Sequence, residues 1–151
     1  MAEKGKDYLN ENDIKKGVQK RLKKYKHLNF FEHFAMYVGV AQLLEIVLKQ
    51  ILSDKFGYGL DKTERWALGS VVAELKKSGL RQDIFLLLDP VVTDRNYIAH
   101  DLLASHLLFH AILNSKKAVY TKEKKRLIRA TYELEQVFFL IECTNQNDGW
   151  W

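Results

Sequence analysis

The stretch PVVTDRNYIAHDLLASHLLFHAILN, residues Pro90 to Asn114, indicates the fold of this chain. Its apolar residues recur at spacings of three and four, which predicts an amphipathic α-helix. At about 100° per residue, a core-facing stripe forms around Ile98. That stripe comprises Ile98, Leu102, Phe109 and Ile112. A second face mixes leucines with polar side chains, namely Asn96, His100, Leu103, Leu107 and His110. Since leucines lie on both faces, both must be covered, by other helices or by a second copy of the chain.

The same spacing runs through the rest of the sequence. One proline, and no hairpin signal, argue against strands. We therefore expect an all-α fold, an up-and-down bundle of four to six helices. The first two predicted helices span 14–27 and 30–53. The third is capped by Thr63 and ends near Gly79, and the fourth starts at Pro90 with Asp89 as its N-cap. The last spans 122–143. The expected division is a basic N-terminal helix or extension over 1–28, a bundle over 29–144 and a loose tail over 145–151.

Composition narrows the class of protein. With 151 residues and a single cysteine, Cys143, the chain predicts one globular unit without a disulfide framework or a cysteine-based zinc site. The N-terminus is charged and lacks the apolar core of a signal peptide. The most apolar segment, 30–52, carries Glu45 near its middle, where a charge in lipid would be costly. We therefore expect a cytoplasmic protein with no membrane segment.

Positive charge is concentrated in two segments. Residues 1–28 hold nine Lys/Arg against four acids, and residues 116–129 hold seven against one, whereas the whole chain has a net charge of +5. Two basic patches on a mildly acidic body are typical of a protein that binds a polyanion, although solvated helix faces have the same composition. The candidate RNA-binding residues in these patches are Lys20, Arg21, Lys23, Lys24, Lys124, Lys125 and Arg126.

The segment RNYIAH, Arg95 to His100, resembles the R-x4–6-H signature of the HEPN superfamily (higher eukaryote and prokaryote nucleotide-binding domains). Asn96 meets the preference of that signature for a polar residue directly after the arginine. The order of the segments also agrees, with LLEIVLKQIL and then ERWALGSVVAELKK preceding the motif helix. The resemblance covers about residues 30–143 and implies an HEPN-like bundle.

The resemblance also implies an activity. Catalytic HEPN domains cleave RNA without a metal, by attack of the 2′-hydroxyl on the adjacent phosphate, at a site shared by two motifs across a dimer interface. Imidazole moves protons near neutral pH, which suits His100, and a guanidinium fork holds phosphate, which suits Arg95. Asn96 would orient the imidazole or bond a phosphate oxygen. Leu103 and Leu107 would lie in the dimer interface.

Some features depart from that pattern or leave alternatives open. HEPN toxins of one subset carry a tyrosine two residues after the histidine, where this chain has Leu102. His106 and His110 have the spacing of metal ligands but no third ligand in register, so neither a metal nor another cofactor is expected. The resemblance points to a toxin or phage-defence effector with an antitoxin or regulatory protein partner. The alternatives are a catalytically silent HEPN module that binds RNA or a partner protein, and an unrelated helical adaptor.

Overall fold

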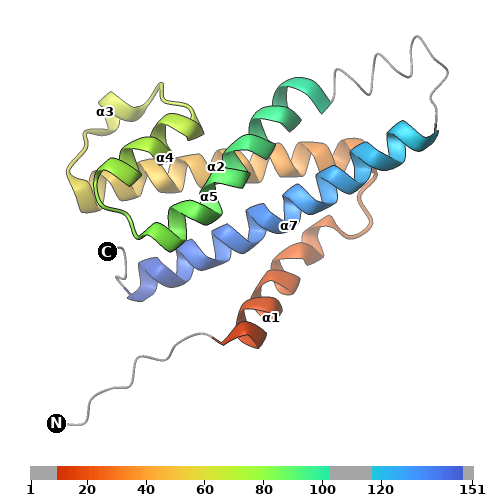
Figure 1. Cartoon of the computed structure of the whole chain (residues 1–151), viewed down its shortest axis with the longest axis horizontal. Coiled ribbons are helices and arrows are strands. Elements are labelled where there is room, and N and C mark those ends of the chain that lie inside the picture. The colour runs from red at the N-terminus through yellow and green to blue at the C-terminus, as the bar shows by residue number, and fades with distance from the viewer. Residues whose placement is uncertain (1–9, 103–116, 148–151) are drawn as a thin grey trace.

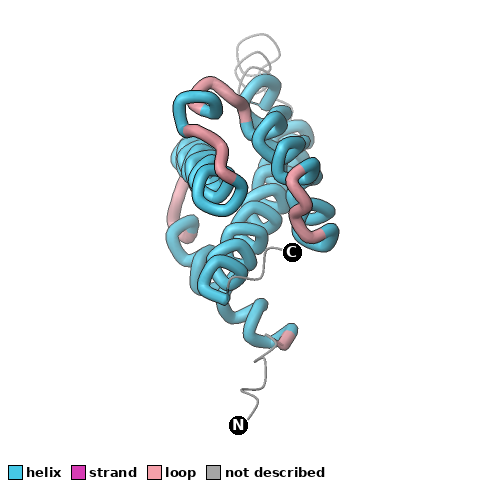
Figure 2. The backbone as a smooth tube through the Cα atoms, turned by 90° about the vertical axis from the view of Figure 1, so that its left-hand side faces the viewer, coloured by secondary structure: helices cyan, strands magenta, loops and turns pink. Residues whose placement is uncertain are grey.

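The computed structural model describes residues 10–102 and 117–147, and within these ranges every regular element is a helix (Figures 1 and 2). The elements are α1 (Glu11–Leu22), the 3-10 turn η1 (Lys23–Tyr25), α2 (Phe30–Phe56), α3 (Leu60–Thr63), α4 (Leu68–Lys77), α5 (Gln82–Tyr97), the π-helical turn η2 (Ile98–Leu102) and α7 (Lys117–Asn147). The predicted all-α bundle is confirmed.

Helix α7 is the element on which the others converge. Helices α1, α2 and α5 all pack against it, and α4 joins α2 to α5 (Figure 1). One continuous apolar core lies between these helices. Its largest fully buried side chains are Tyr37, Leu44, Leu48 and Leu52 of α2, Leu68 and Leu75 of α4, Leu88 of α5, Ile98 of η2, and Leu127 and Leu134 of α7. Burial of each such side chain contributes roughly 1.5–3 kcal/mol to folding.

Local sequence sets several of the helix ends. Asn29 accepts a hydrogen bond from the Glu32 amide, and the Glu32 carboxylate accepts one from the Asn29 amide, which forms a capping box at the start of α2. Gly57 ends α2 in the left-handed conformation, with φ of 75°. Gly79, with φ of 98°, follows α4, as the sequence predicted.

The predicted start of the motif helix at Asp89 and Pro90 is wrong. Helix α5 begins at Gln82 and passes through Pro90 without ending. Pro90 lacks the amide that would bond to the Leu86 carbonyl, but both residues are exposed, so water can satisfy that carbonyl. The opposite face holds the helix together, because Ile84, Leu88 and Val91 form one buried stripe across the proline.

Other helix ends also differ from the predicted ones. Thr63 does not cap the following helix: it ends the short α3, is buried, and donates its hydroxyl hydrogen bond back to the Leu60 carbonyl. Helix α4 begins only at Leu68. Helix α1 starts at Glu11, capped by the Asn10 side chain, and passes into η1 after Leu22. The last helix runs from Lys117 to Asn147, beyond the predicted 122–143 at both ends.

Helix α2 is the one described helix that is long and apolar enough to cross a membrane. A core helix has the same properties, and α2 places eight side chains in the core of the bundle.

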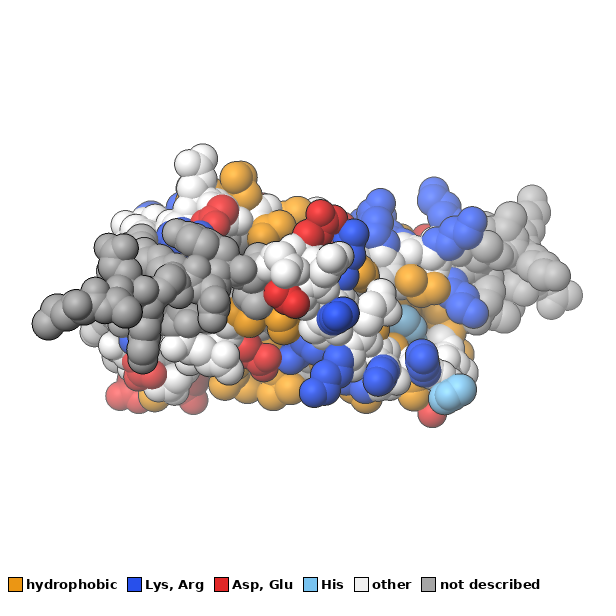
Figure 3. Space-filling view, turned by 90° about the horizontal axis from the view of Figure 1, so that it is seen from below, with side chains coloured by type: hydrophobic (Ala, Val, Ile, Leu, Met, Phe, Trp, Pro, Cys, Tyr) orange, Lys and Arg blue, Asp and Glu red, His pale blue; other side chains and the backbone are white. Residues whose placement is uncertain are grey.

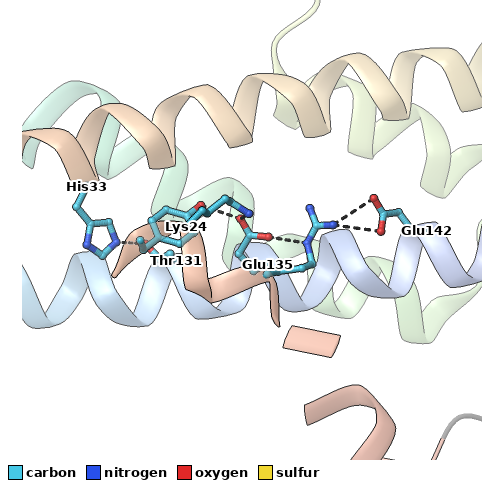
Figure 4. A network of polar contacts seen from close by, with 7 residues as sticks. Lys24, His33, Thr131, Glu135 and Glu142 are labelled. Carbon is cyan, nitrogen blue, oxygen red and sulfur yellow. Dashed lines mark hydrogen bonds and ion pairs between the residues drawn. The ribbon is translucent and has the colours of Figure 1, made fainter. Parts of the chain in front are cut away.

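A buried carboxylate joins α1 and η1 to α7 (Figure 4). Glu135 is 0% exposed and accepts hydrogen bonds from Arg21 Nε at 2.6 Å and Tyr25 Oη at 2.7 Å. Lys24 Nζ lies 2.5 Å from the same carboxylate. Arg21 also bonds to the exposed Glu142. Three donors on one carboxylate compensate for the loss of water around it.

The helices approach closely beside this network. A Cβ added to Gly17 would lie 2.3 Å from the Phe139 ring, so only glycine allows α1 to sit this near to α7.

We expect Glu135→Ala to lower the free energy of unfolding by about 3–5 kcal/mol, because it leaves Arg21, Lys24 and Tyr25 without their shared acceptor. Glu142→Ala is the matched control, since Glu142 contacts the same arginine but its side chain is 50% exposed. That control should cost less than about 1 kcal/mol. Urea unfolding followed by circular dichroism measures both, and equal losses would show that the buried network is not the main link between α1 and α7.

Candidate functional site

The motif lies where α5 passes into η2. Arg95 and Asn96 occupy the last turn of α5, and His100 lies within the π-helical turn. The side chains of Asn96 and His100 are exposed, and Arg95 is partly exposed. All three side chains therefore reach the surface within one short stretch of the chain.

The π-helical turn affects the geometry of the motif. In a straight α-helix, residues five apart such as Arg95 and His100 lie about 140° apart around the axis. A π turn pairs residue i with i+5 and is wider, so each residue within it advances the helix by a smaller angle. His100 is consequently rotated toward the side of Arg95. Single π turns of this kind occur frequently at functional sites.

Tyr97 attaches the motif to the beginning of α7. Its hydroxyl donates a hydrogen bond to the Glu123 carboxylate, with both oxygens at 3.0 Å. The guanidinium of Arg126 lies over the Tyr97 ring, 3.5 Å from its centroid. Burial, together with the Glu123 carboxylate, raises the pKa of the Tyr97 phenol, so it stays a donor. The segment that carries the motif is thus fixed to one end of α7 by a polar contact and a cation–π contact.

Beneath the motif, Asp94 of α5 meets Glu133 of α7. Asp94 is buried, and a hydrogen bond to it, followed by burial and by the Asp94 charge, raises the pKa of Glu133 to about 7. The Glu133 atom Oε2 is buried, and no donor among the described residues reaches it. A carboxylate oxygen without a donor is costly in that environment, so a proton on Glu133 is favoured.

Tyr37 lies below this carboxyl pair. Its side chain is 0% exposed, and its hydroxyl has no hydrogen-bond partner in the described part of the chain. Burial raises the pKa of Tyr37, the negative charges of Asp94 and Glu133 raise it further, and the nearby positive charge of Arg95 lowers it. The charge of Arg95 therefore reaches the buried groups that lie beneath the motif.

Helix α1 and η1 pack on α7, with Arg21 against Glu135 and Glu142, and Figure 3 shows Lys and Arg side chains gathered on one face of the molecule. Within the described ranges, Lys20, Lys23, Lys124 and Lys125 are exposed and make no ion pair. The other three candidates have structural partners. Arg21 and Lys24 hold Glu135, and Arg126 is half-buried against Tyr97. The four lysines are the ones available to a polyanion.

Several predicted residues lie outside the described ranges. Leu103 and Leu107, the predicted interface residues, belong to this group, as do His106 and His110. Among the residues that are described, no three His, Cys, Asp or Glu side chains gather as a metal site would require. Burial, and then the charge of Glu142, raise the pKa of Cys143, which keeps the thiol in its unreactive form.

Two residues that the sequence did not predict to belong to the site are Asp94 and His33. Asp94 lies at the spacing of the buried stripe Val91, Asp94, Ile98, and His33 at that of Phe30, His33, Tyr37. That spacing could have identified both residues from the sequence, because a polar residue on a buried stripe needs a hydrogen-bond partner on the neighbouring helix.

No family model, curated protein or solved structure matches this chain.

The carboxyl pair predicts a pH-dependent stability. The pKa of Glu133 is raised from the ordinary range near 4.5 to about 7, so its protonated form stabilises the fold below the ordinary value, and that stability is lost as the pH rises through about 7. Glu133→Gln should therefore be more stable than the natural chain at pH 8.5, by on the order of 1–2 kcal/mol, and equally stable at pH 5.

Urea unfolding at pH 5, 7 and 8.5 measures this difference. Glu45→Gln, which removes a carboxylate from an i, i+4 ion pair with Lys49, is the control and should show no such trend. A Glu133→Gln difference that stays constant across the range would refute a shared proton.

Proposed function

We propose that this protein is a metal-independent endoribonuclease of the HEPN type, which cleaves single-stranded RNA. The observation that carries the proposal is the accessible triad of Arg95, Asn96 and His100 around a π-helical turn. These residue types supply the two functions that cleavage by a 2′-hydroxyl needs, a proton carrier and a fixed cation for the phosphate.

Each side chain has a distinct role in the proposed reaction. His100 takes the proton of the 2′-hydroxyl as it attacks the adjacent phosphate, or delivers a proton to the departing 5′-oxygen. Arg95 stabilises the charge that builds on the phosphate oxygens. Asn96 orients the imidazole or bonds a phosphate oxygen. The products are a 2′,3′-cyclic phosphate and a free 5′-hydroxyl. The reaction therefore needs neither a metal nor an external nucleophile.

The position of the basic segments supports an RNA substrate. Tyr97, within the motif, bonds to Glu123, and the exposed Lys124 and Lys125 follow directly on α7. A strand held by these lysines would lie at the same end of the molecule as the motif. Cation contacts with phosphates supply much of the affinity for single strands and weaken with salt.

The proposed site is composite, with two motifs facing each other in a homodimer, as the sequence reading expected. A second partner, an antitoxin or regulatory protein, belongs to the same proposal, as does action on cellular or phage RNA in the cytoplasm. The leading alternative is a silent HEPN module that binds RNA or a partner protein through the same surface.

Cleavage of a labelled single-stranded RNA in EDTA tests the activity. We expect cleavage to persist in EDTA and to leave cyclic phosphate. His100→Ala and Arg95→Ala should each reduce the rate by at least about 100-fold, because each removes a group that acts in the transition state. Arg95→Lys should restore little, since an ammonium does not reproduce the guanidinium fork.

Lys77→Ala is the control for that assay, because Lys77 lies at the end of α4 in a local pair with Glu74. It should cleave at the natural rate. A folded dimer that leaves RNA intact under these conditions would favour the silent module.

Light scattering tests the dimer. We expect twice the chain mass of 17.7 kDa at micromolar concentration, and a monomer for Leu103→Arg combined with Leu107→Arg, because charges on an apolar interface oppose its burial. The monomeric variant should also lose cleavage. A natural chain that is monomeric and still cleaves RNA would exclude the composite site.

A further inference from the structure

His33 lies in the first turn of α2 and faces Thr131 of α7 (Figure 4). Its Nε2 atom is 2.8 Å from Thr131 Oγ1 of α7, and its ring packs on Tyr25 with centroids 5.0 Å apart. Tyr25 in turn bonds to the buried Glu135. The imidazole is therefore held in one orientation by groups that are themselves fixed.

The hydrogen bonds define which nitrogen carries the proton. Thr131 donates its only hydroxyl proton to the Leu127 carbonyl at 2.7 Å, so toward His33 it can only accept. Nε2 must therefore be the protonated nitrogen, and the neutral ring has its lone pair on Nδ1. Nδ1 has no hydrogen-bond partner among the described residues, and the side chain is only half-buried.

The surroundings keep this ring neutral in the free protein. Burial, and then the positive charge of Lys124, lower the pKa of His33 below its usual range. Lys24 also lies nearby, over the Tyr25 ring, but its charge is paired with Glu135. On its own helix, the nearest acid is Glu32, which is committed to the capping box. No carboxylate in the described ranges is thus placed to hold a protonated His33.

We infer that His33 is a phosphate-binding residue on an RNA-binding surface, and that it takes up a proton at Nδ1 when a backbone phosphate lies between it and Lys124. The proton comes from solvent, and no covalent bond changes. The phosphate replaces the missing carboxylate: it neutralises Lys124 and accepts a hydrogen bond from the new N–H. The inference rests on the proposed function in taking the polyanion to be RNA.

A nucleic-acid strand suits the shape of this surface. The exposed lysines are spread along two elements, Lys20 and Lys23 on α1 and η1, and Lys124 and Lys125 on α7. An extended polyanion with regularly spaced charges can reach such a row, whereas a single small anion would contact only one or two of them. His33 lies between the two pairs and would report on occupancy of the middle of the row.

The test uses a fluorescent 2′-O-methyl RNA 12-mer, which lacks the attacking hydroxyl, so that binding is measured without cleavage. Anisotropy at pH 6 and pH 8 should show about tenfold tighter binding at pH 6 for the natural chain. At pH 6 the imidazole of His33 is protonated at little cost in free energy, which adds one positive charge to the surface. His33→Gln keeps an N–H that can donate to Thr131 but cannot be protonated, and should lose most of this pH dependence.

His27→Asn is the matched control. His27 is exposed and has φ of 52°, a left-handed conformation that asparagine tolerates, and the variant should retain the full pH dependence. Should His33→Gln fail to fold by circular dichroism, the His33 ring signals of the natural protein serve instead. NMR titration should show that the pKa of His33 rises when the 12-mer is added. Without RNA, the pKa of His33 should be higher in the Lys124→Gln variant than in the natural chain.

Retention of the pH dependence in a folded His33→Gln, or His33 signals that do not respond to RNA, would overturn the inference. Binding to anionic lipid vesicles without binding to the 12-mer would also overturn it. The expected binding result without any cleavage of natural RNA would instead reject the ribonuclease proposal and leave this surface intact.

Discussion

The arrangement of the molecule depends on the buried carboxylate of Glu135. Glu135, in the middle of α7, is the shared acceptor of the Arg21 guanidinium and the Tyr25 phenol, and so joins α1 and η1 to α7. A charged group with no exposed surface is stable only when its hydrogen bonds replace water, and here three donors do so. The same contact fixes α1 and η1, and with them Lys20 and Lys23, on α7, the helix that also carries Lys124 and Lys125.

Two carboxyl groups two residues apart on α7 respond to their surroundings in opposite ways. Glu135 meets three donors, Arg21, Lys24 and Tyr25. Glu133 points to the other side and meets Asp94, so it is favoured with a proton. Helix α7 thereby holds α1 by charge and α5 by a shared proton. The contact beneath the motif is sensitive to pH near neutrality, because the pKa of Glu133 is raised to about 7.

Sequence reasoning predicted the helical class and several helix ends because those features are local. Spacings of three and four identified the helices, and the glycines after α2 and α4 marked their ends. Reasoning of that kind failed at Pro90, where the packing of Leu88 and Val91 overrides a local preference for starting a helix. It also failed for Asp94 and His33, whose partners Glu133 and Thr131 lie about 40 and 98 residues away in the chain. Partner identity across an interface is a property of tertiary structure, which periodicity cannot supply.

The motif residues were found because their spacing is short. The π-helical turn that contains His100 was not predicted, because the spacing of the apolar residues indicates an ordinary α-helix there.

The contacts of α7 relate the motif to the basic surface. Tyr97 lies between Arg95 and His100 and bonds to Glu123, while the next residue along, Lys124, is the one whose charge reaches His33. Movement of the first turns of α7 would therefore act on both places together. The first turns of α7 thus connect the two places through a single helix.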